Sequence, residues 1–414
     1  MRILYLSQYY PPEIGATQTR AAEMAAGLAR AGHHVTVLAE MPNHPHGVMA
    51  PEYRGRLVAR TQEEGVDVIR VWVKTSPVKH FRTRMAFYLS YMAMAGLTGQ
   101  WLIDGRYDVV YATSPPLFVG GAGLALSYGR RTPLVLEVRD LWPESAVQLG
   151  ELGSPGAVAL ATRLEEACYA RARHIVAATD GIRNRLLARG VPPNEVTMIP
   201  NGANTDRYTP RPADPALRAR LGLAPDQFVA LYTGLHGLAH GLETILYAAD
   251  ALRDQPEIVF LLVGDGPQKA SLKAQAEQMQ LPNVRFLAAV PERELPDTLA
   301  LGDVGLDVRR KLAISQGTLP VKMFSYMACE LPVILGIEGE AADVVNQSGA
   351  GMVVPPERPE ALAAAIRTLQ ADPARRRAMG GAGRRLVLER YARAAQAEAL
   401  ADLLARIIGE SQDG

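Results

Sequence analysis

Short apolar runs alternate along the chain with longer segments that have helical spacing. The first run, Arg2–Ser7, precedes a proline-containing loop, a helix predicted over 19–30 and a second strand at His34–Ala39, which together make one βαβ unit. Strands that are apolar throughout are typical of a parallel sheet covered on both faces, so residues 1–200 are predicted to form one α/β domain. Its other predicted strands are Val66–Val71, Val109–Thr113, Leu134–Val138, His174–Ala178 and Val196–Pro200.

The same pattern starts again after a proline-rich connector at 208–215. The strands predicted there are Phe228–Tyr232, Ile258–Val263, Val284–Phe286, Val304–Asp307, Pro332–Leu335 and Gly351–Val353. From residue 375 onward the sequence is rich in Ala, Arg, Leu and Glu, with helical spacing and no further strand. We therefore expect a linker over 201–215, a second α/β domain over 216–385 and a C-terminal helical segment over 386–414 that packs back on the first domain.

Length and composition agree with two folded domains. The 414 residues exceed one ordinary core, 48% of them are apolar, and no segment is biased enough to predict disorder. The formal charge of +1 argues against bulk nucleic-acid binding, and two cysteines supply neither a disulfide framework nor a Cys-based zinc site. Because the N-terminus resembles a first strand rather than a signal sequence, we expect the protein to stay in the cytosol.

Candidate binding loops follow the predicted strands of the second half. In open parallel sheets, ligands bind beyond the carboxyl ends of the strands, where helix N-termini expose free N–H groups. Three loops have suitable sequences, and they are Gly234–Gly241, Gly264–Pro267 and 316–322. The first has glycines that would let backbone amides reach a diphosphate, although an ordinary strand-to-helix turn is an equal alternative. The second is more often a turn than a site.

Lysine 322 lies at the start of a predicted helix, directly after Pro320 and Val321. A cation is unfavourable there unless an anion is also bound, which favours a functional interpretation over a solvent-facing lysine. The basic run Arg309, Arg310 and Lys311 follows the strand Val304–Asp307 at the same predicted edge. Most such runs are solvated surface, so the run alone decides nothing.

Fewer candidates arise in the first half. Gly15 follows the first strand, and Asp140 with Glu144 flanks a Trp-Pro pair after the strand Leu134–Val138. These carboxylates could orient an acceptor hydroxyl, but a single Asp after a strand is more often a helix N-cap. The loop with Asn43, His44 and His46 offers polar groups for sugar contact, or is a plain surface loop. The histidine spacing does not indicate a metal site.

The sequence resembles the retaining glycosyltransferases of family 4, which have the GT-B fold: two facing Rossmann-like α/β domains and a C-terminal closing helix. The resemblance covers almost the whole chain and is nearest to the bacterial branch that makes O-antigen, capsule and exopolysaccharide, which includes N-acetyl-L-fucosamine transferases. The segments that carry it are SQYYPPEIGATQTRAAEMAAGLARAGHHVTVLAE near the N-terminus, EVRDLWPES, IPNGANTDRY, YTGLHGLAHGLETILYAA, LVGDGP and LPVKMFSYMACELPVI.

The resemblance implies a set of site residues. It places Gly15 beside the donor diphosphate, the Gly234–Gly241 loop under its phosphates, and Asp140 in the loop that faces the donor sugar and the acceptor. Lys322 would neutralise the leaving group, and with Asp140 it is the candidate catalytic residue. The candidate donor-binding residues are Gly15, Gly234, His236, Gly237, His240, Gly264, Val290, Lys322 and Ser325.

Four positions depart from the family pattern. Arg139 stands where many members have a histidine, and an arginine cannot act as a general base at neutral pH. Leu235 and His240 occupy positions where many members keep an Arg and a Lys that clamp the diphosphate. Ser325 replaces a glutamate that holds the ribose hydroxyls in many members. The diphosphate site is therefore expected to depend on Lys322 and backbone amides.

The resemblance implies transfer of a hexose, N-acetylated by expectation, from a UDP-sugar to a polyprenyl-diphosphate-linked glycan, without a metal or other cofactor. Two alternatives stay open, a UDP-sugar 2-epimerase and a non-catalytic nucleotide-sugar-binding subunit. No nucleic-acid partner is expected. Basic residues beside the apolar segment Phe87–Trp101 suggest peripheral contact with the inner face of the plasma membrane, with a buried helix as an equal alternative. These basic residues are Lys74, Lys79, His80, Arg82 and Arg84.

Overall fold

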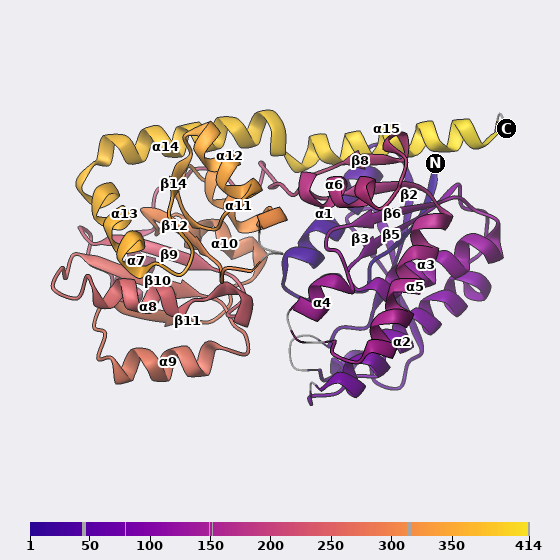
Figure 1. Cartoon of the computed structure of the whole chain (residues 1–414), viewed down its shortest axis with the longest axis horizontal. Helices are drawn as coiled ribbons and strands as arrows, with labels where there is room; N and C mark the ends of the chain where they lie inside the picture. The colour runs from indigo at the N-terminus through magenta and orange to yellow at the C-terminus, as the bar shows by residue number, and fades with distance from the viewer. Residues whose placement is uncertain (44–46, 79, 149, 151, 313–315, 413–414) are drawn as a thin grey trace. The chain divides into compact units, whose positions relative to one another are not determined.

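A computed structural model describes residues 1–43, 47–78, 80–148, 150, 152–312 and 316–412 (Figure 1). The chain divides into two compact units. The first unit contains Met1–Pro200 together with Arg393–Gly414, and the second contains Asn201–Ala392. The second unit thus includes residues 201–215, expected as a linker, and residues 386–392, expected as part of the C-terminal segment that packs on the first domain.

The first unit is built on an eight-stranded sheet within the described residues, in the order β3-β4-β2-β1-β5-β6-β7-β8. All neighbouring pairs are parallel except β3 and β4, which are antiparallel. The strands are β1 (Arg2–Leu6), β2 (His34–Glu40), β3 (Val58–Glu63), β4 (Val66–Val71), β5 (Val109–Ser114), β6 (Leu134–Val138), β7 (Ala172–Ala177) and β8 (Val196–Met198).

Helices cover both faces of this sheet because its strands are apolar on both sides. Ile3 and Tyr5 of β1 pack in one core with α1 and α15, whereas Leu4 and Leu6 pack in another with α2, α3 and α5. The helices are α1 (Ala16–Arg30), α2 (Phe81–Leu97), α3 (Leu117–Arg130), α4 (Glu144–Gln148), α5 (Pro155–Arg171), α6 (Asp180–Ala188) and α15 (Arg393–Gln412), with shorter turns η1 (Pro51–Tyr53), η2 (Thr98–Leu102) and η3 (Pro193–Glu195).

The second unit repeats the design with a six-stranded parallel sheet, in the order β11-β10-β9-β12-β13-β14 among the described residues. Leu231 and Leu261 pack against α11 and α12 on one face, and Ala230 and Leu262 pack against α8, α9 and α13 on the other. The strands are β9 (Phe228–Thr233), β10 (Ile258–Val263), β11 (Val284–Leu287), β12 (Val304–Val308), β13 (Val333–Gly336) and β14 (Gly351–Val353).

The helices of the second unit follow the same alternation with its strands. The longer ones are α7 (Pro215–Arg220), α8 (Glu243–Asp250), α9 (Lys269–Gln278), α10 (Leu295–Leu299), α11 (Val321–Ala328), α12 (Glu340–Ser348), α13 (Pro359–Ala371) and α14 (Pro373–Leu386). Short turns are η4 (Leu238–His240), η5 (Glu292–Glu294) and η7 (Val387–Tyr391).

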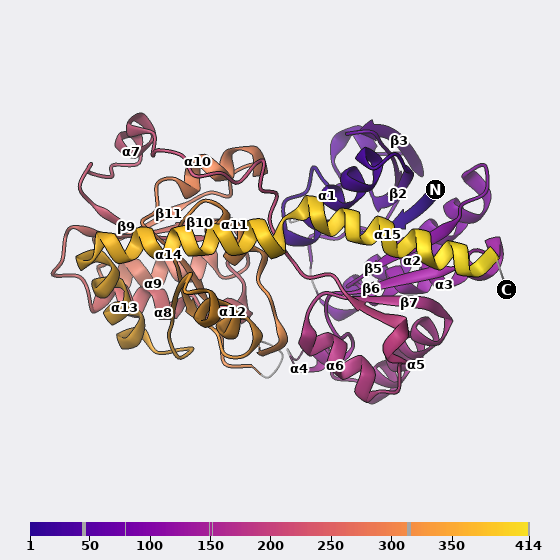
Figure 2. The same cartoon turned by 90° about the horizontal axis from the view of Figure 1, so that it is seen from above.

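The C-terminal helix α15 lies beside α1 in the first unit (Figure 2). A Cβ added to Gly27 of α1 would lie 2.4 Å from the Ala397 Cβ, so the two helices approach closely at this glycine. The contact is also charged, because Arg393 Nε donates to Glu23 Oε2 at 3.0 Å and both side chains are buried. Helix α15 therefore completes the core on one face of the first sheet.

Among the described strands, the edge strand β3 is the one that the sequence did not predict. Its sequence, VARTQE, has three exposed polar side chains in succession, so it lacks the apolar run that marks the buried strands. Edge strands need to bury only one row of side chains, which weakens the pattern.

Among the described residues, no helix combines the length and the apolar character needed to cross a membrane.

Candidate functional site

Three loops of the second unit meet at the carboxyl edge of its sheet. They follow β9, β10 and β12, which are neighbours in the sheet, and the start of α11 lies beside them. Since parallel strands end at one edge, residues far apart in sequence converge there. This edge contains the glycine-rich loop Gly234–Gly241, the turn after β10 and Lys322.

Two of these loops pack backbone against backbone. Gly234 N–H donates to Val263 O at 2.9 Å, and His236 N–H donates to Asp265 O at 2.8 Å. Gly264 has φ +152°, and a Cβ there would lie 1.8 Å from Gly234 O. Only glycine fits such an approach, so Gly264 is required by packing rather than by a simple turn.

Tyr232, at the end of β9, supports the glycine-rich loop from below. Its hydroxyl donates to Leu235 O at 2.7 Å, which fixes the first turn of the loop. The Lys322 ammonium lies over the Tyr232 ring, with Nζ 3.9 Å from the ring centroid, a cation–π contact. A Cβ on Gly234 would lie 3.2 Å from the same Nζ, so the ammonium is next to the first glycine of the loop.

Lys322 occupies the second position of α11, whose N-cap is Pro320. Its side chain is 13% exposed, and Nζ forms no hydrogen bond with any described residue. Burial lowers the pKa of Lys322 to about 7; the nearby Asp307 carboxylate opposes this shift and Arg309 adds to it. The amine is thus held close to a helix N-terminus and a glycine-rich loop, where an anion would restore its charge.

This environment makes donor binding sensitive to pH. Below about pH 7 the Lys322 amine is protonated and attracts a diphosphate, and above it the free amine does not. We expect the dissociation constant for a nucleotide sugar to rise by up to about tenfold per pH unit above pH 7, because one proton is taken up on binding. Calorimetric titration from pH 6 to 9 measures this, and a Lys322→Met variant should lose the dependence. A constant affinity over the range would contradict the assignment.

His236 and His240 belong to the same loop and are both buried, at 0% and 9% exposure. Burial lowers the pKa of His236 to about 4, with further lowering by Lys269 and Lys322. Burial also lowers the pKa of His240 to about 2, helped by Lys322 and Arg309. Both rings are therefore neutral near pH 7, and His240 does not supply the positive charge of a lysine at this position.

The remaining predicted residues of the second unit lie farther along the same elements. Ser325 is one turn after Lys322 on α11 and is buried. Val290 follows β11, is partly buried and packs against the core beside α11. Lys269 Nζ donates to the carbonyls of Gly264 and Leu287 at 2.6 and 2.7 Å, which joins the turn after β10 to the end of β11.

In the first unit, the Gly15 loop and the Asp140 loop lie together. Gly15 is the N-cap of α1, and Thr17 in the first turn accepts a hydrogen bond from Arg139 Nη1 at 3.0 Å. Arg139 also donates to Thr113 Oγ1 at 2.8 Å and to Pro115 O at 3.1 Å. It is thereby fixed as a structural cation, which agrees with its not being a base.

A buried ion pair anchors this region. Arg20 and Glu137 approach to 2.7 Å, and each side chain is 1% exposed. Although burial opposes ionisation, Arg20 and then Arg139 lower the pKa of Glu137 to about 2. Next to it, burial raises the pKa of Asp140, against hydrogen bonds from Ser145 and from the Leu141 backbone. Asp140 is thus held by the turn before α4.

Of the other sugar-contact candidates of the first unit, only Asn43 lies within the described residues. Asn43 is buried, and its Nδ2 donates to Glu40 Oε1 at 2.8 Å and to Met41 O at 3.0 Å, so it anchors its own loop. His44 and His46 lie outside the described residues. Within the part of the chain that is described, no cluster of three His, Cys, Asp or Glu side chains could hold a metal ion.

Each of the two units matches a family of known proteins. Residues 15–202 match the glycosyl transferase 4-like domain, and residues 214–386 match the glycosyl transferases group 1. The chain is 31% identical to the putative colanic acid biosynthesis glycosyl transferase WcaI of Escherichia coli, over 89% of this chain and 91% of WcaI. The chain belongs to the GT-B glycosyltransferases of family 4.

One further relative and one solved structure that resembles this glycosyltransferase have names that state their nucleotide sugars. One is the GDP-mannose-dependent alpha-(1-6)-phosphatidylinositol monomannoside mannosyltransferase of Mycolicibacterium smegmatis, 30% identical over 54% of this chain and 59% of the relative. The other is the crystal structure of Anabaena HepE in complex with UDP-glucose, with a TM-score of 0.73 and 19% identity over 98% of this chain and all of HepE. The second likeness shows the GT-B fold.

Sequence reasoning missed three side chains of the glycosyltransferase site. Asp307 was predicted only as the last residue of a strand, yet it is fully buried beside Lys322. A charged residue at the end of an apolar strand run was the available signal. Tyr232 and Lys269 had none, because an aromatic residue in a strand and a lysine at a helix start are common in any α/β fold.

Proposed function

We propose that this glycosyltransferase moves a hexose, N-acetylated by inference, from a UDP-sugar to a polyprenyl-diphosphate-linked glycan during bacterial cell-surface polysaccharide synthesis. The position of the Lys322 ammonium beside Gly234 carries the proposal, since it places a positive charge where a diphosphate would meet the loop amides. The name of WcaI supports the polysaccharide, and the UDP-glucose complex of HepE supports the donor. The GDP-mannose-dependent relative makes a GDP-sugar the rival donor.

The proposed reaction breaks the bond between the sugar anomeric carbon and the diphosphate oxygen. The acceptor hydroxyl forms its bond on the same face of the sugar, and its proton passes to the departing diphosphate. Lys322 stabilises the negative charge that develops on this leaving group, and the loop backbone around Gly234 positions it. Asp140 orients the acceptor hydroxyl. Arg139 takes no proton, because its guanidinium stays charged and is held by Thr113 and Thr17.

The test is a transfer assay with the full chain, UDP- and GDP-sugars and a polyprenyl-diphosphate-linked acceptor, with the product anomer assigned by NMR. The proposal predicts a new glycosidic bond with the donor's anomeric configuration. An inverted product would contradict the retaining reaction. An altered free nucleotide sugar in the absence of acceptor would identify a 2-epimerase, and donor binding without any turnover would identify a non-catalytic subunit.

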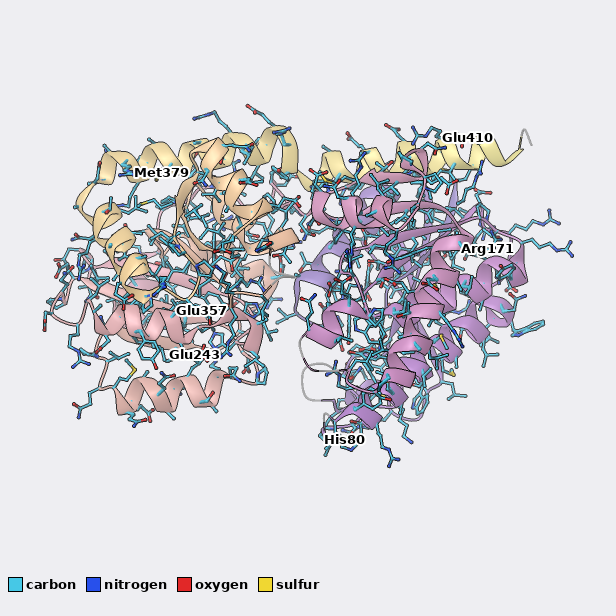
Figure 3. All side chains as sticks on the ribbon, in the orientation of Figure 1. His80, Arg171, Glu243, Glu357, Met379 and Glu410 are labelled. Carbon is cyan, nitrogen blue, oxygen red and sulfur yellow. The ribbon has the colours of Figure 1, made fainter. Side chains whose placement is uncertain are left out.

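We also propose that α2 and η2 contact an anionic membrane surface, where a lipid-linked acceptor lies. These elements expose large apolar side chains at Phe81, Leu89, Leu97 and Trp101, with Trp101 73% exposed. Arg82 is exposed nearby, as are Lys74 and His80; His80 is the N-cap of α2 and lies at one extremity of the first unit (Figure 3). Apolar side chains beside basic ones give the two signals that peripheral binding needs. Lys79 lies outside the described residues.

Trp101→Gln is expected to weaken binding of the full chain to vesicles of phosphatidylethanolamine and phosphatidylglycerol by about fivefold or more, because a large apolar contact is lost. Co-sedimentation measures the binding. The matched control is Leu388→Gln in the second unit, where Leu388 is 49% exposed and binding should be unchanged. Equal binding by both variants, or no preference for anionic over neutral vesicles, would contradict the membrane contact.

A further inference from the structure

Two cations approach one buried carboxylate at the carboxyl edge of the second sheet. Arg309 Nε lies 3.7 Å, and Lys322 Nζ 3.8 Å, from Asp307 Oδ1. Asp307 is fully buried, and neither its oxygens nor Arg309 Nε and Lys322 Nζ form a hydrogen bond with a described residue. Buried charged groups are costly to leave without hydrogen bonds. A cluster of two positive charges and one negative charge therefore suits an incoming anion.

We infer that Arg309 is the second cation of the diphosphate site and that, with Lys322, it replaces the clamp residues missing from the glycine-rich loop. The inference rests on the proposed function, because it assigns the charge that receives the donor diphosphate. The positions that would hold an Arg and a Lys carry Leu235 and His240. The first is apolar, and the second is neutral near pH 7.

The backbone places Arg309 against the glycine-rich loop. Its strand, β12, pairs with β9, so the loops after the two strands are adjacent. Arg310 N–H donates to Ala239 O at 3.0 Å, and a Cβ on Gly241 would lie 3.5 Å from the Arg309 carbonyl carbon. The backbone of Arg309 therefore lies against the loop on the β12 side, and its charge adds to the effect of burial in lowering the pKa of His240 in that loop, while Lys322 approaches the loop from α11. Together they flank the backbone that would hold the phosphates.

The three residues of the basic run 309–311 form ion pairs with different carboxylates. Arg310 pairs with Glu243 at 2.8 Å, at the start of α8 where Figure 3 labels the glutamate, and Lys311 pairs with Glu338 at 2.9 Å. Each of these cations has a carboxylate of its own. Arg309 shares Asp307 with Lys322 and is only 22% exposed, so it alone of the three is drawn into the site. An arginine also offers several donors to phosphate oxygens.

The test compares Arg309→Gln with Lys311→Gln, which removes the same charge from a side chain that is 63% exposed. The full chain is titrated by calorimetry with UDP, UMP and uridine. If GDP binds more tightly than UDP, the titrations use GDP, GMP and guanosine instead. Arg309→Gln should weaken the diphosphate by about 10- to 100-fold, the value of a charged hydrogen bond, with less than about threefold change for the nucleoside. Lys311→Gln should leave all three affinities unchanged, and Arg309→Lys should recover part of the loss.

Three results would overturn the inference. If Arg309→Gln weakens diphosphate and nucleoside equally, Arg309 acts on the fold and not on the phosphates. If Lys311→Gln weakens the diphosphate as much, the effect is a general loss of positive charge. If the unmodified chain binds no nucleoside diphosphate, the proposed function fails and the inference fails with it, whereas a failure of the inference alone leaves diphosphate binding intact.

Discussion

Lys322→Met is expected to lower kcat/KM for sugar transfer by about 10³-fold or more, because it removes a positive charge aimed at the leaving diphosphate. The site is partly closed to water, with Lys322 13% exposed, so the charge is worth more there than on the surface. The loss should fall on kcat as well as on donor affinity, since charge on the leaving group grows as the bond breaks. Steady-state kinetics with the full chain measure both.

The control for this variant separates chemistry from folding. Removing Lys322 leaves the buried Asp307 carboxylate with only one of its two neighbouring cations, Arg309, which destabilises the second unit. The double variant Lys322→Met/Asp307→Asn removes both charges and should restore stability without restoring turnover. A double variant with near-normal turnover would show that Lys322 acts only as a counterion of Asp307, and the proposed role in transfer would be wrong.

Gly264→Ala is expected to destabilise the second unit by about 3 kcal/mol and to weaken nucleotide binding by about 100-fold. At φ +152° an alanine is strained, and its Cβ would meet Gly234 O at 1.8 Å. The two loops must then separate, which moves the backbone around Gly234 away from the position proposed for the diphosphate. Thermal unfolding and calorimetric titration of the folded variant measure the two effects.

Gly349→Ala provides the matched comparison. Gly349 also has a positive φ, +66°, but a Cβ there would meet nothing within 4 Å. This variant has backbone strain without a clash and should cost about 1 kcal/mol, with normal donor affinity. If both variants lower stability equally and neither affects binding, the close packing of the two loops has no part in the site.

The layered fold could be predicted because buried strands have a strong local signal. Runs such as Ile258–Val263 are apolar throughout, and only a strand covered on both faces has this pattern. The edge strand Val58–Glu63 escaped the prediction because its register is set by pairing with β4 and not by its own side chains. The pattern therefore reports burial, and an element that is mostly exposed leaves little trace in it.

The sequence indicated which loops are candidates for the site, but not which of their residues contact one another. The glycine-rich loop and Lys322 could be proposed from the sequence because glycines after a strand and a cation at a helix start conflict with ordinary preferences. The role of Gly264 was not found, because its partner Gly234 is distant in sequence and the contact is between backbones. Arg309 was noted only as part of a basic run and Asp307 only as the end of a strand, because only the fold brings Lys322 close to Asp307 and Arg309.

The most direct test of the central claim is the thermal protection of the full chain by nucleoside diphosphates, measured for the unmodified protein and for Lys322→Met. Ligands that bind the native state raise the unfolding temperature, and at a fixed ligand concentration the rise grows with the logarithm of the affinity. We expect UDP to protect the unmodified chain more than GDP or ADP does, and Lys322→Met to lose most of this protection. Absence of protection by every nucleoside diphosphate, or equal protection of the variant, would contradict it.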